Sequence, residues 1–100
     1  MLRAMALGGG GCISASCNSN VAGIRALYER ARAGDTAGAG VLAPQIDGHR
    51  AAVQAGGLIP GLKALKAAQT GDARWLNLRP PLLPADPASA TALADTIAVL

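Results

Sequence analysis

The sequence predicts a mainly α-helical chain that contains one short β-strand. Apolar residues recur at helical spacing over most of its length, and glycines stand where each helix is expected to stop. The segment GCISAS (11–16) is the exception, because it is short, flanked by glycine and anchored by the β-branched Ile13. Small and apolar side chains on both faces are typical of a buried parallel strand. Aromatic residues make up only 2% of the chain, so its core is built from alanine, glycine and leucine.

The first third of the chain predicts a helix, a strand and a second helix. Residues 1–7 are compatible with a short helix, which the glycines at 8–11 stop. The polar run at 18–20 (Asn, Ser, Asn) can cap a helix that carries Val21, Ile24, Leu27 and Tyr28 at helical spacing. Gly34 then occupies the position at which a helix commonly ends. Residues 8–34 therefore predict a strand, a tight turn and a helix, which is half of a βαβ unit.

The rest of the chain predicts three further helical regions. Asp35 can cap a helix that runs to about Ala55, and Pro44 and Gly48 predict a kink in it or a division into two pieces.

Pro60 suits the first turn of the next helix, which ends before Gly71. We expect three side chains of this helix to point inward: Leu62, Leu65 and Ala68. A proline-braced loop covers residues 72–87. Asp86 caps a last helix, which places on one face Leu93, Ile97 and Leu100.

Charge and hydropathy exclude two classes of partner. The nine basic and six acidic residues give a net charge of +3 and are scattered, so no basic stripe for a nucleic acid is formed. No apolar run approaches the roughly 18–20 residues of a membrane span. The start, MLRAMALGGGGC, is broken by glycines before an apolar signal-peptide core can form. We therefore expect a cytoplasmic chain that binds neither nucleic acid nor membrane.

Few residues offer catalytic or metal-binding chemistry. Cys12 and Cys17 lack CxxC spacing, and His49 is the sole histidine, so we expect reduced thiols, no metal ligands and no Cys–His site. We expect both thiols to be small buried hydrophobic groups. The glycine run is no phosphate loop, because the lysine of that motif is missing. Lys63 and Lys66 lie three residues apart on an amphipathic helix and predict a solvated surface.

The acidic residues also have a structural explanation. Each of three aspartates stands beside a predicted helix end, where capping explains it: Asp35, Asp72 and Asp86. Nothing marks them as an acid–base pair, so no catalytic residue is assigned to this chain.

Three segments, in order, resemble the C-terminal part of the dihydrodipicolinate synthase / N-acetylneuraminate lyase family. GGGGCISASCNSNVAGIRALYERARAGD (8–35) resembles the family's glycine-rich approach, its G-x-I-S-x-[ST]-x-N strand and the helix that follows. LIPGLKAL (58–65) resembles N-P-I-P-x-K-x-A-L, and RPPLLP (79–84) resembles R-x-P-L-x-P. The resemblance covers nearly the whole chain. Cys12 and Cys17 depart from it, since the family usually has small residues there.

The resemblance implies a fold and a reaction. Such proteins are (β/α)8 TIM barrels with a C-terminal helical subdomain, so residues 1–34 would be the end of the barrel and residues 35–100 that subdomain. The family forms a lysine Schiff base with pyruvate or another 2-oxo acid, without a cofactor, and makes or breaks a carbon–carbon bond. Its full-length members are homo-oligomers, usually homotetramers. Ile13 would line the pyruvate site at the end of strand eight.

The same resemblance places the Schiff-base lysine and the relay tyrosine on earlier strands, which this chain does not contain. Lys63 matches a lysine of the helical subdomain, not the catalytic one. We therefore expect a fragment or truncated lyase that is inactive alone. The alternative is a small non-enzymatic helical protein that binds a partner sheet through its glycine-flanked strand.

Overall fold

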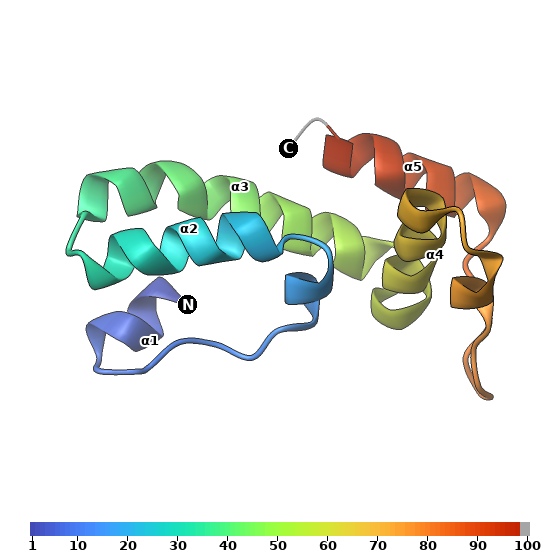
Figure 1. Ribbon diagram of the computed structural model, residues 1–100, viewed down its shortest axis with the longest axis horizontal. Helices are drawn as coiled ribbons and strands as arrows, with labels where there is room; N and C mark the ends of the chain where they lie inside the picture. The colour runs from blue at the N-terminus through green and yellow to red at the C-terminus, as the bar shows by residue number, and fades with distance from the viewer. Residues whose placement is uncertain (99–100) are drawn as a thin grey trace. The chain divides into compact units, whose positions relative to one another are not determined.

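A computed structural model describes residues 1–98, which are mainly helical, as the sequence predicts. Within these residues, five α-helices and two short 3-10 helices follow one another in the order of Figure 1. The α-helices are α1 (Leu2–Ala6), α2 (Val21–Arg32), α3 (Thr36–Ala55), α4 (Leu58–Thr70) and α5 (Pro87–Ala98), and the 3-10 helices are η1 (Ala15–Asn18) and η2 (Ala73–Leu76).

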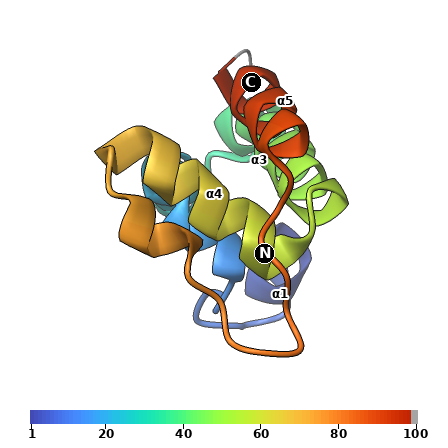
Figure 2. The same ribbon diagram turned by 90° about the vertical axis from the view of Figure 1, so that its right-hand side faces the viewer.

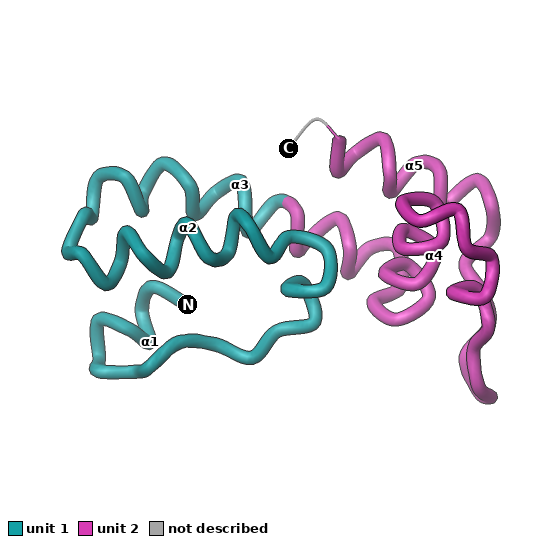
Figure 3. The backbone as a smooth tube through the Cα atoms, in the orientation of Figure 1, with its two compact units in different colours: residues 1–48 teal, residues 49–100 magenta. Residues whose placement is uncertain are grey.

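The chain divides into two compact units, residues 1–48 and 49–100, which Figure 3 draws in different colours. The division falls inside α3. The boundary expected between residues 34 and 35 concerns the barrel and the helical subdomain of the complete family fold, and it stays a prediction.

In the first unit, α2 has the cap and the stop that the sequence predicts. Oδ1 of Asn20 accepts a 3.1 Å hydrogen bond from the N–H of Gly23, which satisfies one of the unpaired donors of the first turn. Gly34 follows the helix with φ of 74°, a left-handed conformation that glycine adopts without strain. Leu27 and Ala39 are each 3% exposed and belong to the core of this unit, where α1 and η1 both contact α2.

The strand expected at residues 11–16 is wrong for this chain, since the described residues contain no β-strand. Residues 9–14 are an extended segment without secondary structure, visible in Figure 1 between α1 and η1, and residues 15 and 16 begin η1. The physical reason is that a strand exists only through hydrogen bonds to a neighbouring strand, and this chain supplies none. Residues 9–14 are therefore an unpaired extended segment that precedes η1 and α2.

The third helix is continuous, although Pro44 and Gly48 predict a kink or two shorter pieces. It begins after Asp35, whose Oδ1 accepts a 2.8 Å hydrogen bond from the N–H of Gly38. Pro44 lies inside the helix, which is not divided at either residue, so the expectation of two pieces is wrong. Proline lacks one N–H donor, and the hydrogen bonds on both sides of it hold the helix together. Glycines at 56 and 57 end α3, as predicted.

In the second unit, the core lies between α4, α5 and the end of α3. α4 contacts both η2 and α5 (Figure 2). Leu62 and Leu65 are buried, as predicted, but Ala68 is exposed, so its inward assignment is wrong. The buried face of α4 lies in its first two turns, whereas Ala68 belongs to its last turn. Core residues from the neighbouring helices are Val53 of α3, which is fully buried, and Leu93 of α5.

The loop between α4 and α5 is fastened at both ends. The Nζ of Lys63 donates a hydrogen bond to the carbonyl oxygen of Asn77, which ties the loop to α4. At the other end, Asp86 caps α5 by accepting a 3.0 Å hydrogen bond from the N–H of Ser89, as predicted. Leu93 is buried and Ile97 is half-buried on the predicted face of α5, and the third member of that face, Leu100, lies outside the described residues.

Candidate functional site

The glycine-rich segment before η1 is the part of the chain that the family resemblance associates with substrate. Gly8 and Gly11 have φ of 89° and 149°, within the range that only glycine adopts readily. The N–H of Gly9 donates a 2.8 Å hydrogen bond to the carbonyl oxygen of Ala4, and a Cβ at position 9 would stand 2.8 Å from that same oxygen. Glycine is therefore required at Gly9 by the close approach of the segment to α1.

Ile13, the one predicted substrate-lining residue, is fully exposed in this chain, at 106% of its reference accessibility. Beyond it, Oγ of Ser14 accepts a 3.4 Å hydrogen bond from the N–H of Ser16, and Ser16 is buried in η1. Ile13 is thus held beside an ordered turn with nothing packed on it. Its role in a substrate pocket stays a prediction.

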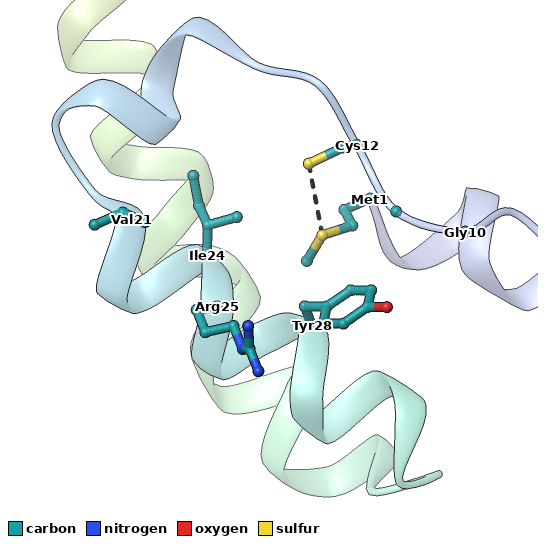
Figure 4. A pocket seen from close by; sticks show the side chains of 8 residues that line it. Met1, Gly10, Cys12, Val21, Ile24, Arg25 and Tyr28 are labelled. Atoms are coloured by element: carbon teal, nitrogen blue, oxygen red, sulfur yellow. Dashed lines mark hydrogen bonds between the residues drawn. The ribbon is translucent and has the colours of Figure 1, made fainter.

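A shallow cavity of about 310 Å³ lies between the glycine-rich segment and α2. Figure 4 shows the Sγ of Cys12 directed at Met1, with Ile24, Arg25 and Tyr28 carried by α2. The Sγ of Cys12 lies 3.7 Å from the Sδ of Met1. The residues that line the cavity are Met1, Gly10, Gly11, Cys12, Val21, Ile24, Arg25 and Tyr28.

Two side chains that line this cavity interact with other residues of α2. Nη2 of Arg25 forms a 2.5 Å ion pair with Glu29, one helical turn along. The guanidinium of Arg32 lies 5.8 Å from the centroid of the Tyr28 ring, within range of a cation–π contact. No histidine or carboxylate lines the cavity, so Cys12 has no base beside it and the chemistry of an activated thiol is not assembled there.

The expectation that both thiols are buried is wrong. Cys12 is exposed and Cys17 is half-buried, and both are free thiols, as expected. The reason is that the segment carrying Cys12 has no neighbouring strands to cover it.

His49 contributes to folding and does not line the cavity that holds Cys12. It lies on α3, is 5% exposed, and belongs to the second unit. Burial lowers the pKa of His49 below its ordinary value, because desolvation disfavours the charged imidazolium. The ring is therefore neutral at pH 7.

The two lysines of α4 are half-buried, which differs from the solvated surface that their spacing predicts. Lys63 holds Asn77, and neither Lys63 nor Lys66 is among the residues that line the cavity on α2 or the cavity between the end of α3 and α5. A Schiff-base lysine needs a lowered pKa and a pocket for the carbonyl compound. Neither of these two cavities offers such a pocket to Lys63 or Lys66.

The three aspartates act as caps, as predicted, and the pKa of each carboxyl lies below its usual range. For Asp35 the main cause is the hydrogen bond from the N–H of Gly38, followed by that from Arg30. The pKa of Asp72 is lowered mainly by hydrogen bonds from the side chain and the N–H of Arg74. The pKa of Asp86 is lowered mainly by hydrogen bonds from the side chain and the N–H of Ser89. Hydrogen bonds to a carboxylate favour its charged form. None of these groups is poised to donate or accept a proton near neutral pH.

The second unit contains an open cavity of about 320 Å³ between the end of α3 and α5. It is lined by Ala52, Ala55, Gly56, Ser89, Ala92, Leu93 and Thr96. Both hydroxyls are engaged locally, since Ser89 donates to Asp86 and Thr96 donates a 2.8 Å hydrogen bond to the carbonyl oxygen of Ala92. This cavity is a packing gap lined by small side chains, without a reactive group.

Sequence reasoning missed the cavity on α2, although its signal was present. Val21, Ile24, Arg25 and Tyr28 recur at intervals of three and four residues, so they share one face of the helix. This helical spacing predicts a helix without predicting a cavity, and in the structure Met1 and the glycine-rich segment lie across the face.

Two further classes of site are not found in the described part of the chain. Residues 1–98 contain no cluster of three or more histidine, cysteine, aspartate or glutamate side chains that could hold a metal ion. None of the helices in this range is both long and apolar enough to cross a membrane.

Comparison with known proteins identifies the lineage. No curated protein and no solved structure is significantly similar to the chain. A family profile does match it, over residues 1–100, and this agrees with the three ordered segments that resemble the end of such a protein. The chain belongs to the Dihydrodipicolinate synthetase family.

Proposed function

We propose that this chain is the C-terminal part of a class I aldolase-type lyase, comprising the last βα unit of a (β/α)8 barrel and the helical subdomain after it. The observation that carries the proposal is the family match over residues 1–100. The order of the three resembling segments supports it, because each corresponds to the end of the family sequence. The helical character of residues 36–98 is consistent with the subdomain.

The complete protein would act on pyruvate or another 2-oxo acid. A lysine amine would add to the keto carbon and, with loss of water, form an imine. Loss of a proton from the neighbouring carbon would give an enamine, whose carbon attacks an aldehyde or imine partner; the reverse sequence breaks the same bond. Lys63 is bonded to Asn77, and neither Lys63 nor Lys66 lines the two cavities described above. The reacting lysine would therefore belong to a part of the barrel outside this chain.

Ile13 would line the pocket for the 2-oxo acid. Barrel enzymes hold their substrates at the carboxyl ends of the strands, and Ile13 lies near the carboxyl end of the segment that corresponds to strand eight. Its full exposure fits this role, because the pocket needs side chains from other strands to close over it. The complete protein would form a homo-oligomer and work in the cytoplasm, as its family does.

Borohydride trapping tests the proposal. Borohydride reduces an imine to a stable secondary amine, so labelled pyruvate stays attached to any lysine that forms a Schiff base. The isolated 100-residue chain is expected to take up no label, while a full-length family enzyme, treated in parallel, is labelled on one lysine. Stoichiometric labelling of Lys63 or Lys66 in the isolated chain would overturn the assignment of the catalytic lysine to another part of the protein.

A second observation tests, independently of chemistry, whether the chain is part of a longer lyase. The genomic DNA upstream of the Met1 codon is expected to encode, in frame, further (β/α) units with a lysine on the sixth strand. Unrelated coding sequence there would favour the alternative of a small non-enzymatic protein.

A further inference from the structure

Two sulfur atoms from separate segments of the first unit meet in the cavity on α2. The Sγ of Cys12 lies 3.7 Å from the Sδ of Met1, as the dashed line in Figure 4 shows. The chain between them doubles back along α1, where the N–H of Gly9 donates a 2.8 Å hydrogen bond to the carbonyl oxygen of Ala4. A thiol is a weak hydrogen-bond donor and a thioether is a weak acceptor, so the contact by itself contributes little to folding.

The separation of the two sulfur atoms suits coordination of one metal ion by both. With metal–sulfur bonds of about 2.3 Å, sulfur atoms 3.7 Å apart subtend an angle of about 107° at the metal, which is close to the tetrahedral angle. The pair therefore needs little rearrangement to hold one ion. Cys12 is exposed and Met1 is half-buried, so an ion can reach both sulfur atoms from solvent and complete its coordination with solvent ligands.

The surroundings of the pair favour a soft, monovalent metal ion. Thiolate and thioether ligands select soft ions such as Cu(I), whereas Mg²⁺ and Ca²⁺ require oxygen ligands. No histidine or carboxylate lines this cavity, and the charge of Arg25, which does line it, is balanced by Glu29. A monovalent ion on one thiolate leaves no net charge beside the apolar side chain of Ile24 and the ring of Tyr28. A divalent ion would leave a positive charge there, which is costly in apolar surroundings.

We propose that Met1 and Cys12 form a binding site for one soft monovalent metal ion, such as Cu(I), through a thioether and a thiolate sulfur. On binding, the S–H bond of Cys12 breaks, its proton goes to solvent, and a metal–sulfur bond forms in its place without electron transfer. The pair lies outside the definition of a cluster of three histidine, cysteine or carboxylate side chains, because methionine supplies one ligand. The two residues are eleven positions apart, a spacing that matches no metal motif, and the site is independent of the proposed lyase function.

A titration with Ag(I), a soft monovalent ion that is inert to air, tests whether the thioether takes part. The chain has two methionines, so a sample labelled with ¹³C in the methionine methyl groups gives two signals, which the variant Met5→Leu assigns. Silver nitrate is added to the full chain in chloride-free buffer. We expect the methyl signal of Met1 to shift until one equivalent of Ag(I) is bound, whereas the signal of Met5, which does not line the cavity, stays in place.

Matched variants locate the site by affinity for Cu(I), measured without oxygen in competition with the chelator bicinchoninate. Cys12→Ser should weaken binding by at least ~100-fold and Met1→Leu by about tenfold or more, because each removes one sulfur ligand. Cys17→Ser and Met5→Leu remove the same groups elsewhere in the first unit and should bind like the parent chain. All chains carry a two-residue extension before the first methionine, so that this residue can be replaced. Circular dichroism shows whether each variant keeps its helices.

The results distinguish a two-sulfur site from an ordinary reactive thiol. Binding that is lost in Cys12→Ser but unchanged in Met1→Leu overturns the proposal, because the thiol then binds the ion alone. Equal weakening by Cys17→Ser, or a silver titration that leaves the methyl signal of Met1 in place, overturns it as well. Native mass spectrometry should show one metal ion on one chain, and a complex of two chains bridged by the ion would assign the metal to an intermolecular contact instead.

Discussion

The same substitution, glycine to alanine, is expected to have opposite effects at two helical positions of this chain. At Gly61 of α4, a Cβ would stand 3.0 Å from the carbonyl oxygen of Gly56 and 3.2 Å from Cδ2 of Leu93. At Gly40 of α3, no heavy atom lies within 4 Å of the added methyl group. Comparing the two substitutions therefore separates the effect of helix propensity on stability from the effect of packing.

The magnitudes follow from these distances. In a helix interior, alanine is favoured over glycine by about 1 kcal/mol, so Gly40→Ala should stabilise α3 by about that amount. Gly61→Ala gains the same term, but its neighbours must move by a few tenths of an ångström, and overpacking a core costs about 1–3 kcal/mol. The two substitutions should therefore differ by about 1–3 kcal/mol in their effect on the free energy of unfolding, with Gly61→Ala neutral or destabilising.

Urea unfolding followed by Trp75 fluorescence reports on the second unit, because Trp75 lies in η2 beside α4. Hydrogen exchange of the α3 and α4 amides gives the local free energies, since the two units need not unfold together. Removing the side chain that the new methyl meets, as Leu93→Ala, should shrink the cost of Gly61→Ala in a double-mutant cycle. Equal stabilisation by Gly61→Ala and Gly40→Ala would refute the close approach of α4 to its neighbours.

Four further changes test other parts of the structure. Asn20→Ala should destabilise α2 by about 1 kcal/mol in urea unfolding through loss of the cap, whereas Asn20→Asp should keep it; equal values would contradict the cap. Burial lowers the pKa of His49 in the folded chain below 6.5, so the unfolded chain binds the proton more tightly. The contribution of His49 to the free energy of unfolding should therefore be complete above pH 6.5. It should decrease as the pH drops below 6.5, by at most about 1.4 kcal/mol per pH unit. Unfolding titrations at several pH values should lose part of this slope in His49→Gln, and an unchanged slope would assign it to other groups. Iodoacetamide should alkylate the exposed Cys12 faster than the half-buried Cys17, as read by mass spectrometry, and the reverse order would contradict their placement. Ile13→Asp in the isolated chain should change the free energy of unfolding by less than about 0.5 kcal/mol, because the side chain is fully exposed; a larger loss would show that Ile13 packs within the chain.

The helix ends could be predicted from sequence because each depends on residues within a few positions. Asn20, Asp35 and Asp86 cap the helices that follow them, and each cap is a hydrogen bond to an N–H three residues along. Gly34 and Gly71 adopt positive φ where α2 and α4 end. Such interactions need no information from the rest of the fold.

Burial was harder to predict because it depends on which face of a helix meets a neighbour. Leu65 is buried as expected, but Ala68 on the same helix is exposed. Periodicity identifies an apolar face, yet it does not say how far along that face a neighbouring helix extends. The sequence likewise does not show which segments cover the two cysteines. Both were expected to be buried, whereas Cys12 is exposed and Cys17 is half-buried.

The sequence alone determined the helical character of most of the chain, the position of its caps and stops, and its family. It also placed Ile13 in the one segment that the family associates with substrate. Only the tertiary structure decided that α3 runs unbroken past Pro44 and that residues 9–14 form no strand. The reason is that a helix satisfies its backbone hydrogen bonds within itself, whereas a strand needs a neighbour that these residues do not supply.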